Sequence, residues 1–216
     1  MCDIKLKKAL TVANIFNQKV TLINFSEHAN NLYQAFGNPQ NKGVWFVWGG
    51  SGSGKSSLLL DITKAFCKDL KAIHNELEED LDDVDFITRW QRNNMQDVKH
   101  NVLTASYNYE QMCNYLDKRD SPKVVIINSA TYFFESIQQY FEFSNKYKRR
   151  KIIIISGMAK GKAPFTQLEE KIMFDANKKI FVEGYLASCK GRTIGPNGGS
   201  YIIWQEGYEK LHGAEN

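Results

Sequence analysis

Residues 43–57, Gly-Val-Trp-Phe-Val-Trp-Gly-Gly-Ser-Gly-Ser-Gly-Lys-Ser-Ser, decide the fold of this chain. The apolar run at 44–48 stops at a glycine-rich segment, and a second apolar run with helical spacing follows from Leu58 to Phe66. This order predicts a strand, a tight loop and a helix. Because glycine allows unusual backbone angles and close approach, the stretch has the expected context of a phosphate-binding loop.

The fixed positions of the pattern G-x-x-x-x-G-K-[ST] are occupied by Gly49, Gly54, Lys55 and Ser56. Inward-pointing N–H groups and the positive end of the following helix would surround a phosphate. Lys55 would reach the β- and γ-phosphates, and Ser56 would give its hydroxyl to Mg²⁺. The predicted cofactors are therefore ATP and Mg²⁺, and the alternative is a glycine-rich turn with an incidental lysine. The predicted cofactor-binding residues are Gly49, Gly50, Ser51, Gly52, Ser53, Gly54, Lys55, Ser56 and Ser57.

Length and composition favour one α/β domain, since 216 residues with 43% hydrophobic and 24% charged residues can build a full core. The longest apolar runs have the length of strands and fall far short of the roughly 20 residues that span a membrane. The N-terminus lacks the apolar block of a signal peptide. Four scattered cysteines without a C-x-x-C pair suit a reducing compartment and argue against zinc. We expect a cytoplasmic protein that does not enter a membrane.

Strand and helix patterns alternate after the loop, and this order predicts a mostly parallel sheet with helices on both faces. The β-branched runs 124–127 and 152–155 are typical of buried central strands. The chain should end in an antiparallel hairpin built from 180–186 and 201–204. Residues 1–40 are expected to form an N-terminal extension packed on the core, with a strand-like piece at 19–25, and residues 41–216 the main domain.

Polar residues that follow strands are the candidates for chemistry, because ligands bind beyond the carboxyl ends of such strands. Glu78 and Glu79 follow the strand expected at 71–74. A carboxylate there would orient and activate a water in line with a γ-phosphate. The alternative is that both are members of an acidic helix start.

Asn128 follows the strand 124–127 directly, at the place where a Walker B Asp normally holds Mg²⁺. We predict that Asn128 contributes to the metal site together with Ser56. The amide accepts hydrogen bonds from metal-bound water but offers no charge, so weaker metal retention and slow hydrolysis are expected. On this reasoning, Asn128→Asp should raise turnover.

Basic residues dominate the span 146–192. Lys160 and Lys162 lie in a loop at 157–164 that is expected to be flexible and suited to the phosphate backbone of single-stranded DNA, unless it is an ordinary surface loop. Lys190 and Arg192 stand two apart in a strand and should point to one side, at the sheet edge. The alternative for this pair is a solvated hairpin.

These residues together resemble the RecA-like P-loop ATPases, specifically the branch shared by KaiC-type proteins and DnaB-type replicative helicases. The resemblance covers about residues 37–207 and looks close to small RecA-like ATPases of phages and mobile elements from Bacteroides-like bacteria. It is carried by the P-loop at 49–56, Leu77-Glu78-Glu79, the strand ending at Asn128-Ser129, and Lys190-Gly191-Arg192 with the turn Gly195-Pro196-Asn197-Gly198. The family usually has Asp-Ser where Asn128-Ser129 stands, and a polar sensor, often His or Gln, where Gly157 stands.

The resemblance implies catalytic roles for Glu78, Lys190 and Arg192, the last two as a finger that reaches the γ-phosphate of a neighbouring subunit. It implies a homo-oligomeric ring or filament that hydrolyses ATP on single-stranded DNA in replication or recombination. An alternative is a weakly hydrolysing assembly or regulatory protein, such as a helicase loader or switch, which Asn128 favours. A third alternative, a small-molecule kinase, lacks a recognisable arginine-rich lid.

Overall fold

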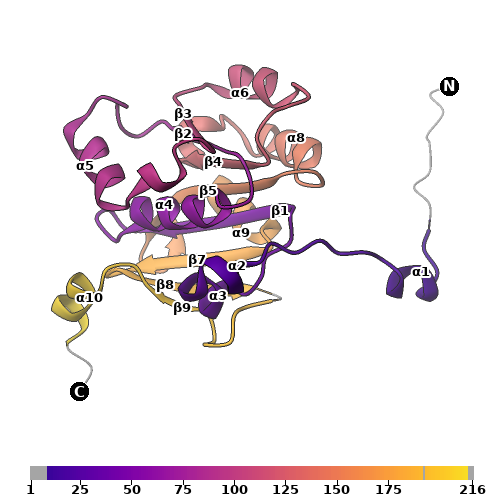
Figure 1. The fold of residues 1–216 in the computed structure, drawn as a ribbon. Helices are drawn as coiled ribbons and strands as arrows, with labels where there is room; N and C mark the ends of the chain where they lie inside the picture. Colours follow the sequence, from indigo (N-terminus) through magenta and orange to yellow (C-terminus); the bar gives the residue numbers. More distant parts are fainter. Residues whose placement is uncertain (1–8, 192, 214–216) are drawn as a thin grey trace.

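A central sheet organises residues 9–191 and 193–213, the part of the chain that the computed structural model describes (Figure 1). Its strands are β1 (Gly43–Gly49), β2 (Ala72–Glu76), β3 (Val102–Ala105), β4 (Val124–Asn128), β5 (Ile152–Lys160), β6 (Ala163–Pro164), β7 (Lys178–Glu183), β8 (Leu186–Gly191) and β9 (Ser200–Ile202). The order is β3-β2-β4-β5-β1-β7-β8-β9, and β6 pairs with β5. The pairs from β3 to β7 along this order are parallel, whereas β8 and β9 add antiparallel strands at one edge. The predicted fold class is confirmed.

Both faces of the sheet are covered, because alternate side chains of each buried strand point to opposite sides. On β1, Trp45 and Val47 join the core under one helical layer, while Val44, Phe46 and Trp48 join the other. The first layer contains α2 (Phe25–His28), α3 (Asn30–Phe36), α4 (Lys55–Phe66) and the 3₁₀ turn η1 (Met95–Val98). The second contains α6 (Tyr109–Leu116), α7 (Ala130–Phe133), α8 (Ile137–Tyr147) and α9 (Gln167–Asp175).

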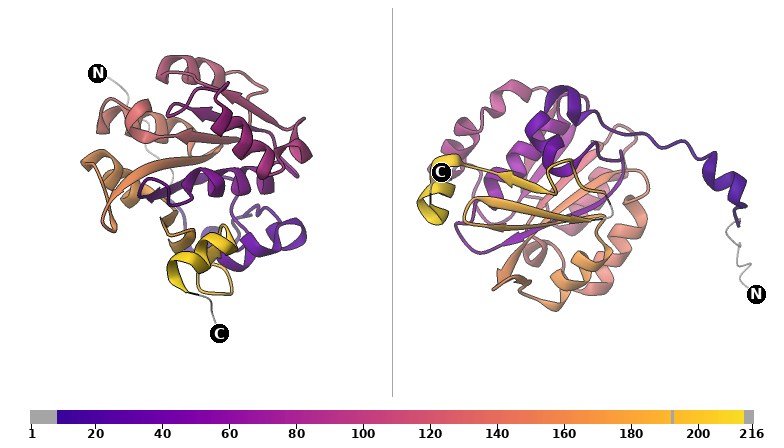
Figure 2. Two further views of the ribbon diagram at one scale, coloured as in Figure 1. Left: turned by 90° about the vertical axis from the view of Figure 1, so that its left-hand side faces the viewer. Right: turned by 90° about the horizontal axis from the view of Figure 1, so that it is seen from below.

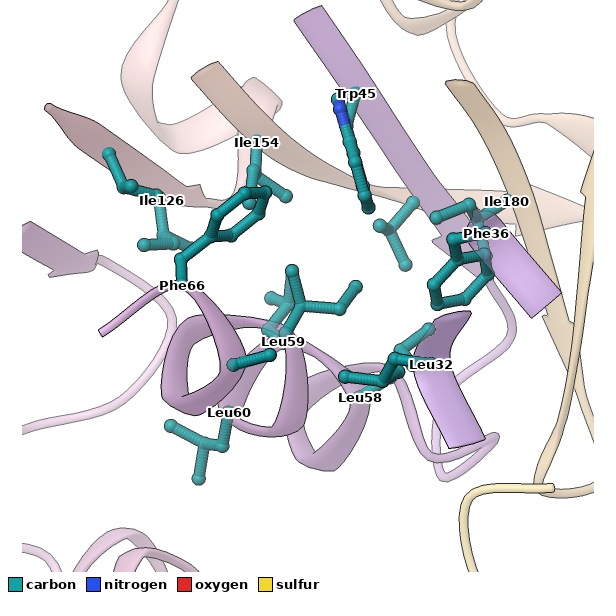
Figure 3. Close-up of a cluster of buried hydrophobic side chains, with 14 of the residues drawn as sticks. Leu32, Phe36, Trp45, Leu58, Leu59, Leu60, Phe66, Ile126, Ile154 and Ile180 are labelled. Atoms are coloured by element: carbon teal, nitrogen blue, oxygen red, sulfur yellow. The ribbon is translucent and has the colours of Figure 1, made fainter. Parts of the chain in front are cut away.

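The helix after the glycine-rich loop is the centre of the first layer. Leu59 and Phe66 of α4 face the sheet residues Ile126 and Ile154 in Figure 3, and all four side chains are fully buried. Burying an aliphatic or aromatic side chain of this size stabilises a fold by about 1.5–3 kcal/mol. The start of α4 is therefore fixed against the carboxyl ends of the parallel strands.

The N-terminal segment divides into an exposed and a packed part. Helix α1 (Val12–Phe16) has no buried residue and stands apart from the body in Figure 2. The strand expected at 19–25 is wrong: Leu22 forms one isolated bridge with Gln40, and Phe25 begins a helix. Phe25 inserts its ring against Phe66, with ring centres 4.8 Å apart, so the chain turns into the core instead of running along a strand.

A long connection from β8 to β9 rests on the C-terminal end of α3. The N–H of Gly195 donates to the carbonyl of Ala35, and a Cβ at position 195 would lie 2.1 Å from the Gln34 carbonyl oxygen, so only glycine fits. The buried Lys178 donates from Nζ to the carbonyl oxygens of Phe36 (2.6 Å) and Thr193 (2.7 Å). The ammonium group of Lys178 therefore links the end of α3 to the connection between β8 and β9.

Two further sequence expectations need correction. The segment 157–164 is not a flexible loop, because β5 continues to Lys160 and forms a hairpin with β6, with Gly161 at φ +62° in the turn. The strand expected at 180–186 is broken at Gly184 and Tyr185, whose positive φ values of 54° and 62° make the tight turn between β7 and β8.

The chain continues past β9 into a helix that the sequence patterns did not indicate, α10 (Gln205–His212). The remaining helix, α5 (Val84–Arg92), follows β2. Within residues 9–191 and 193–213, every helix is too short or too polar to cross a bilayer.

Candidate nucleotide-binding site

The glycine-rich loop joins the end of β1 to the start of α4, as the sequence predicts. A Cβ at Gly49 would lie 2.2 Å from the carbonyl oxygen of Val182, so the first glycine is required by the close approach of β7. Gly52 and Gly54 have φ values of +69° and +104°, which other residues rarely adopt. The loop therefore has the tight backbone path that lets N–H groups surround an anion.

The side chain of Lys55 lies inside this loop. Its Nζ donates to the carbonyl oxygens of Gly49 (3.0 Å) and Gly50 (2.8 Å), and the residue is buried. Burial lowers the pKa of Lys55, while the nearby carboxylates of Glu78 and Glu169 act in the opposite direction. A phosphate would offer this ammonium a charged partner in place of neutral carbonyl groups.

A cavity of about 760 Å³ opens over the loop, a volume within the usual range of about 300–1,000 Å³ for ligand sites. Its walls include 51–57 from the loop and α4, together with Glu78 and Glu79 from the segment after β2. The structure thus brings the predicted Glu78 to the phosphate-binding loop. Asn128 and Lys190 are not among the residues that line this cavity.

Two arginines of α5, Arg89 and Arg92, also line the cavity, and the sequence analysis missed them. Arg89 forms a bidentate pair with Glu79, whose Oε1 lies 3.1 Å from Nη1. The sequence did contain a signal for them: the two arginines stand three apart on a helix, so they share one face, and this helix follows an acidic segment.

Tyr185 is a further wall residue that the sequence patterns did not single out. Its N–H donates to the carbonyl of Ser53 (3.0 Å), and its ring would contact a Cβ placed at Gly54. The turn between β7 and β8 thus covers one side of the loop. No local pattern predicts this contact, because it depends on how β7 pairs with β1.

Asn128 lies in a buried polar network formed by the last residues of β2 and β4 and by Ser156 within β5. Its Nδ2 donates to both carboxylate oxygens of Glu76, at 2.8 and 2.9 Å, and Ser156 donates from Oγ to its Oδ1. All three residues are at most 2% exposed. Both ends of the amide therefore have partners inside the protein, and contact of Asn128 with a metal remains a prediction.

Glu76 is the one acidic member of this network. Burial alone would raise the pKa of Glu76, but the neighbouring His74 and hydrogen bonds from Asn128 and the backbone N–H of Glu78 outweigh burial and lower it. The carboxylate is therefore ionised at neutral pH. The sequence analysis missed Glu76 because it is the last residue of a strand rather than part of the loop after it.

Buried polar atoms without partners lie in the glycine-rich loop and directly after Asn128. Among the described residues, the hydroxyls of Ser53 in the loop and Ser129 after β4 are buried and form no hydrogen bond. An unsatisfied buried hydroxyl is costly, so a bound phosphate or an ordered water would relieve it. With Lys55 for the phosphates and Ser56 at the start of α4 for Mg²⁺, the residues fit a nucleotide with its cation.

Gly157 occupies the place expected for a polar sensor, and the packing explains why. A Cβ there would lie 2.7 Å from both Oε1 of Glu169 and the ring of Phe46. The buried Glu169 carboxylate instead accepts hydrogen bonds from the N–H groups of Met158 (2.7 Å) and Thr166 (2.8 Å). No side chain fits at position 157 while Glu169 holds this place.

The predicted finger and DNA-binding lysines lie outside the cavity. Lys190 is exposed on β8 and pairs in register with Lys179 at the start of β7, far from the strand ends that carry the loop. Arg192 lies outside the described residues. Lys160 and Lys162 are exposed at the tip of the β5–β6 hairpin, and the Lys162 carbonyl accepts a hydrogen bond from Trp48 Nε1.

Similar folds are found among solved structures. The flagellar accessory protein FlaH from Methanocaldococcus jannaschii matches with a TM-score of 0.55 and 15% identity, over 85% of this chain and 92% of that one. A KaiC-like protein from Pyrococcus horikoshii matches with the same TM-score and identity, over 76% of this chain and 90% of that one. No protein-family model and no curated protein sequence matches. The chain therefore has a RecA-like fold, with its glycine-rich loop at the carboxyl edge of the sheet.

Proposed function

We propose that this protein is a cytoplasmic ATPase that binds ATP and Mg²⁺ at 49–57 and acts on single-stranded DNA in replication or recombination as a ring or filament. The observation that carries the proposal is the cavity that Lys55 and Glu78 both line, where the Glu78 carboxylate acts electrostatically on the Lys55 ammonium. The exposed basic hairpin with Lys160 and Lys162 supports a nucleic-acid partner. Kinship with the small ATPases of phages and mobile elements is part of the same proposal.

A second candidate is a nucleotide-dependent assembly or regulatory protein that hydrolyses ATP weakly. The observation that favours it is the amide of Asn128, which stands where a carboxylate usually holds Mg²⁺ and is already engaged by Glu76 and Ser156. The two candidates differ in turnover. Stimulation of ATP hydrolysis by single-stranded DNA is expected of the first alone.

Glu78→Gln should abolish most ATP hydrolysis and leave ATP binding intact. Glu78 is exposed within the cavity, and a carboxylate that activates water contributes about 10²–10⁴ in rate, so a loss of about 10²-fold or more is expected. Phosphate release and the binding of a fluorescent ATP analogue measure the two effects. The neighbouring Asp80→Asn is the control, because Asp80 is exposed and does not line the cavity. An equal loss of ATP hydrolysis in both variants would contradict the catalytic role assigned to Glu78.

The DNA partner is tested by the variant Lys160→Ala/Lys162→Ala. On single-stranded DNA each lysine that contacts a phosphate contributes about 0.7 to the magnitude of the slope of log affinity against log salt, so the double variant should lower that magnitude by about 1.4. Lys68→Ala, an exposed lysine on the opposite helical layer, is the control. Wild-type ATPase activity that does not respond to single-stranded DNA would favour the regulatory candidate.

Mixing inactive Arg192→Ala protein with inactive Lys55→Ala protein should restore ATPase activity. Lys190 lies away from its own loop, so a finger at 190–192 acts only on a neighbouring copy. In a random assembly of equal parts, about a quarter of interfaces then pair an intact finger with an intact loop. A finger supplied in trans is worth about 10³–10⁵ in rate, which makes this fraction easy to measure. Absence of recovery in mixtures that co-assemble would contradict the shared site.

A further inference from the structure

We propose that Glu76, at the end of β2, supplies the negative charge that a Walker B carboxylate would supply from the end of β4. The carboxylate would then lie on β2 and the amide of Asn128 on the neighbouring strand β4. The inference rests on the proposed nucleotide site and assigns its cation-side carboxylate. Asn128 then acts as a positioning residue that holds the Glu76 carboxylate. The residues that carry the inference are Glu76, Asn128, Ser129 and Ser156.

Register places the two residues side by side. Glu76 and Asn128 are direct partners in the parallel pairing of β2 with β4, and both are the last residues of their strands. Adjacent strands are about 4.8 Å apart, so exchanging the residues moves a carboxylate by one strand without moving it along the sheet. The two side chains meet at the carboxyl edge, the edge that carries the phosphate-binding loop.

The hydrogen bonds fix the direction of the amide. Ser156 donates to Oδ1 of Asn128, which leaves Nδ2 to face Glu76, and both Glu76 oxygens accept from it. The reverse orientation of the amide would set its oxygen against the carboxylate. Glu76 Oε1 also accepts from the N–H groups of Leu77 (3.1 Å) and Glu78 (3.0 Å), so the same carboxylate holds the backbone of the cavity residue Glu78.

The charge of Glu76 is not neutralised by a lysine or arginine within the described ranges. The residue is 1% exposed, and the ion pair that it forms there is with His74, at 3.7 Å. Asn128, Leu77 and Glu78 supply hydrogen bonds to this carboxylate but no positive charge, and a buried charge is best stabilised by a paired ion or a bound cation. The unpartnered, fully buried hydroxyl of Ser129 follows Asn128 directly and is a second sign that a polar group is missing here. A divalent cation with its bound water satisfies both requirements.

Three variants test the exchange: Glu76→Gln, Asn128→Asp and the double variant Glu76→Gln/Asn128→Asp. The readouts are the Mg²⁺ concentration for half-maximal binding of a fluorescent ATP analogue, binding in excess EDTA, and thermal unfolding without nucleotide. Glu76→Gln should require about tenfold more Mg²⁺ and change binding in EDTA little, because a cation-side carboxylate acts only through the metal. Glu110→Gln, an exposed acid at the start of α6, is the matched control.

The double variant gives the decisive comparison. It places a carboxylate on β4 and lets the amide introduced on β2 donate back to it, so its Mg²⁺ requirement should return to within about threefold of wild type. A folded double variant that stays as defective as Glu76→Gln, or a Glu76→Gln protein with the wild-type Mg²⁺ requirement, overturns the inference. If Glu76→Gln does not fold, the double variant alone decides. Failure of the wild-type protein to bind the analogue would instead refute the nucleotide site itself.

Discussion

Replacing Lys55 with alanine should reduce ATP affinity by about 10²-fold or more, because each hydrogen bond to a charged group contributes about 1.5–3 kcal/mol and tenfold in affinity corresponds to about 1.4 kcal/mol. In the structure, Nζ of Lys55 is held by the carbonyl oxygens of Gly49 and Gly50 inside the loop, where the phosphates would lie. Removing it leaves several phosphate charges without a partner. Isothermal titration with a non-hydrolysable ATP analogue measures the loss.

Measuring the free energy of unfolding with and without the ATP analogue distinguishes a loss of binding from a loss of folding. Wild-type protein should gain about 2.7 kcal/mol at a ligand concentration of about 100 Kd, while Lys55→Ala should gain almost nothing at the same concentration. The hydrogen bonds that Nζ of Lys55 donates go to two neutral carbonyl groups of the loop, so the nucleotide-free variant should remain folded. Lys68→Ala, just beyond the end of α4, should behave as wild type. Undiminished binding by Lys55→Ala would refute the site.

Asn128→Asp should destabilise the protein by about 3 kcal/mol, because it sets a second carboxylate against a buried one. Nδ2 of Asn128 lies 2.8 and 2.9 Å from the two oxygens of Glu76, and an Asp oxygen at this place would repel them. For a chain of this length the loss corresponds to roughly 6–12 °C in Tm. The sequence alone predicts only a gain in turnover for this variant, because it does not show that Glu76 lies beside Asn128.

Thermal unfolding followed by circular dichroism at neutral pH measures this loss. The control is Asn145→Asp, which makes the same chemical change on an exposed position of α8 and should shift Tm little. Adding Glu76→Gln should recover most of the stability lost in Asn128→Asp, since one carboxylate and one amide then face each other again. A stable Asn128→Asp protein would show that the two side chains do not contact each other.

Much of the fold follows from local patterns, and the reason is physical. Central parallel strands are buried on both faces, so runs such as 124–127 and 152–155 are identifiable as strands without any knowledge of their neighbours. The loop at 49–56 is equally local, because its glycines and Lys55 serve one short turn. The position of Glu78 in the cavity also follows from the rule that ligands lie beyond strand ends.

The features that sequence patterns missed depend on contacts between distant segments. The role proposed for Glu76 depends on its contact with a residue of β4 that lies 52 positions away in the sequence. The fully buried Glu169 excludes a side chain at Gly157 through packing that no spacing rule encodes. The hairpin at 157–164 contains the glycine and lysines of a flexible loop, yet β5 continues into it, paired with β1 up to Met158 and with β6 beyond.

The contact between α3 and the C-terminal strands has a consequence for synthesis on the ribosome. Phe36 packs against Tyr201 with ring centres 6.0 Å apart, and its carbonyl accepts a hydrogen bond from Lys178. Lys178 emerges 142 residues after Phe36, which at a translation rate of about 5–20 residues per second is a delay of roughly 7–30 seconds. Through that interval the apolar side of α3 has no native partner from the C-terminal strands, so a nascent chain exposes it to chaperones.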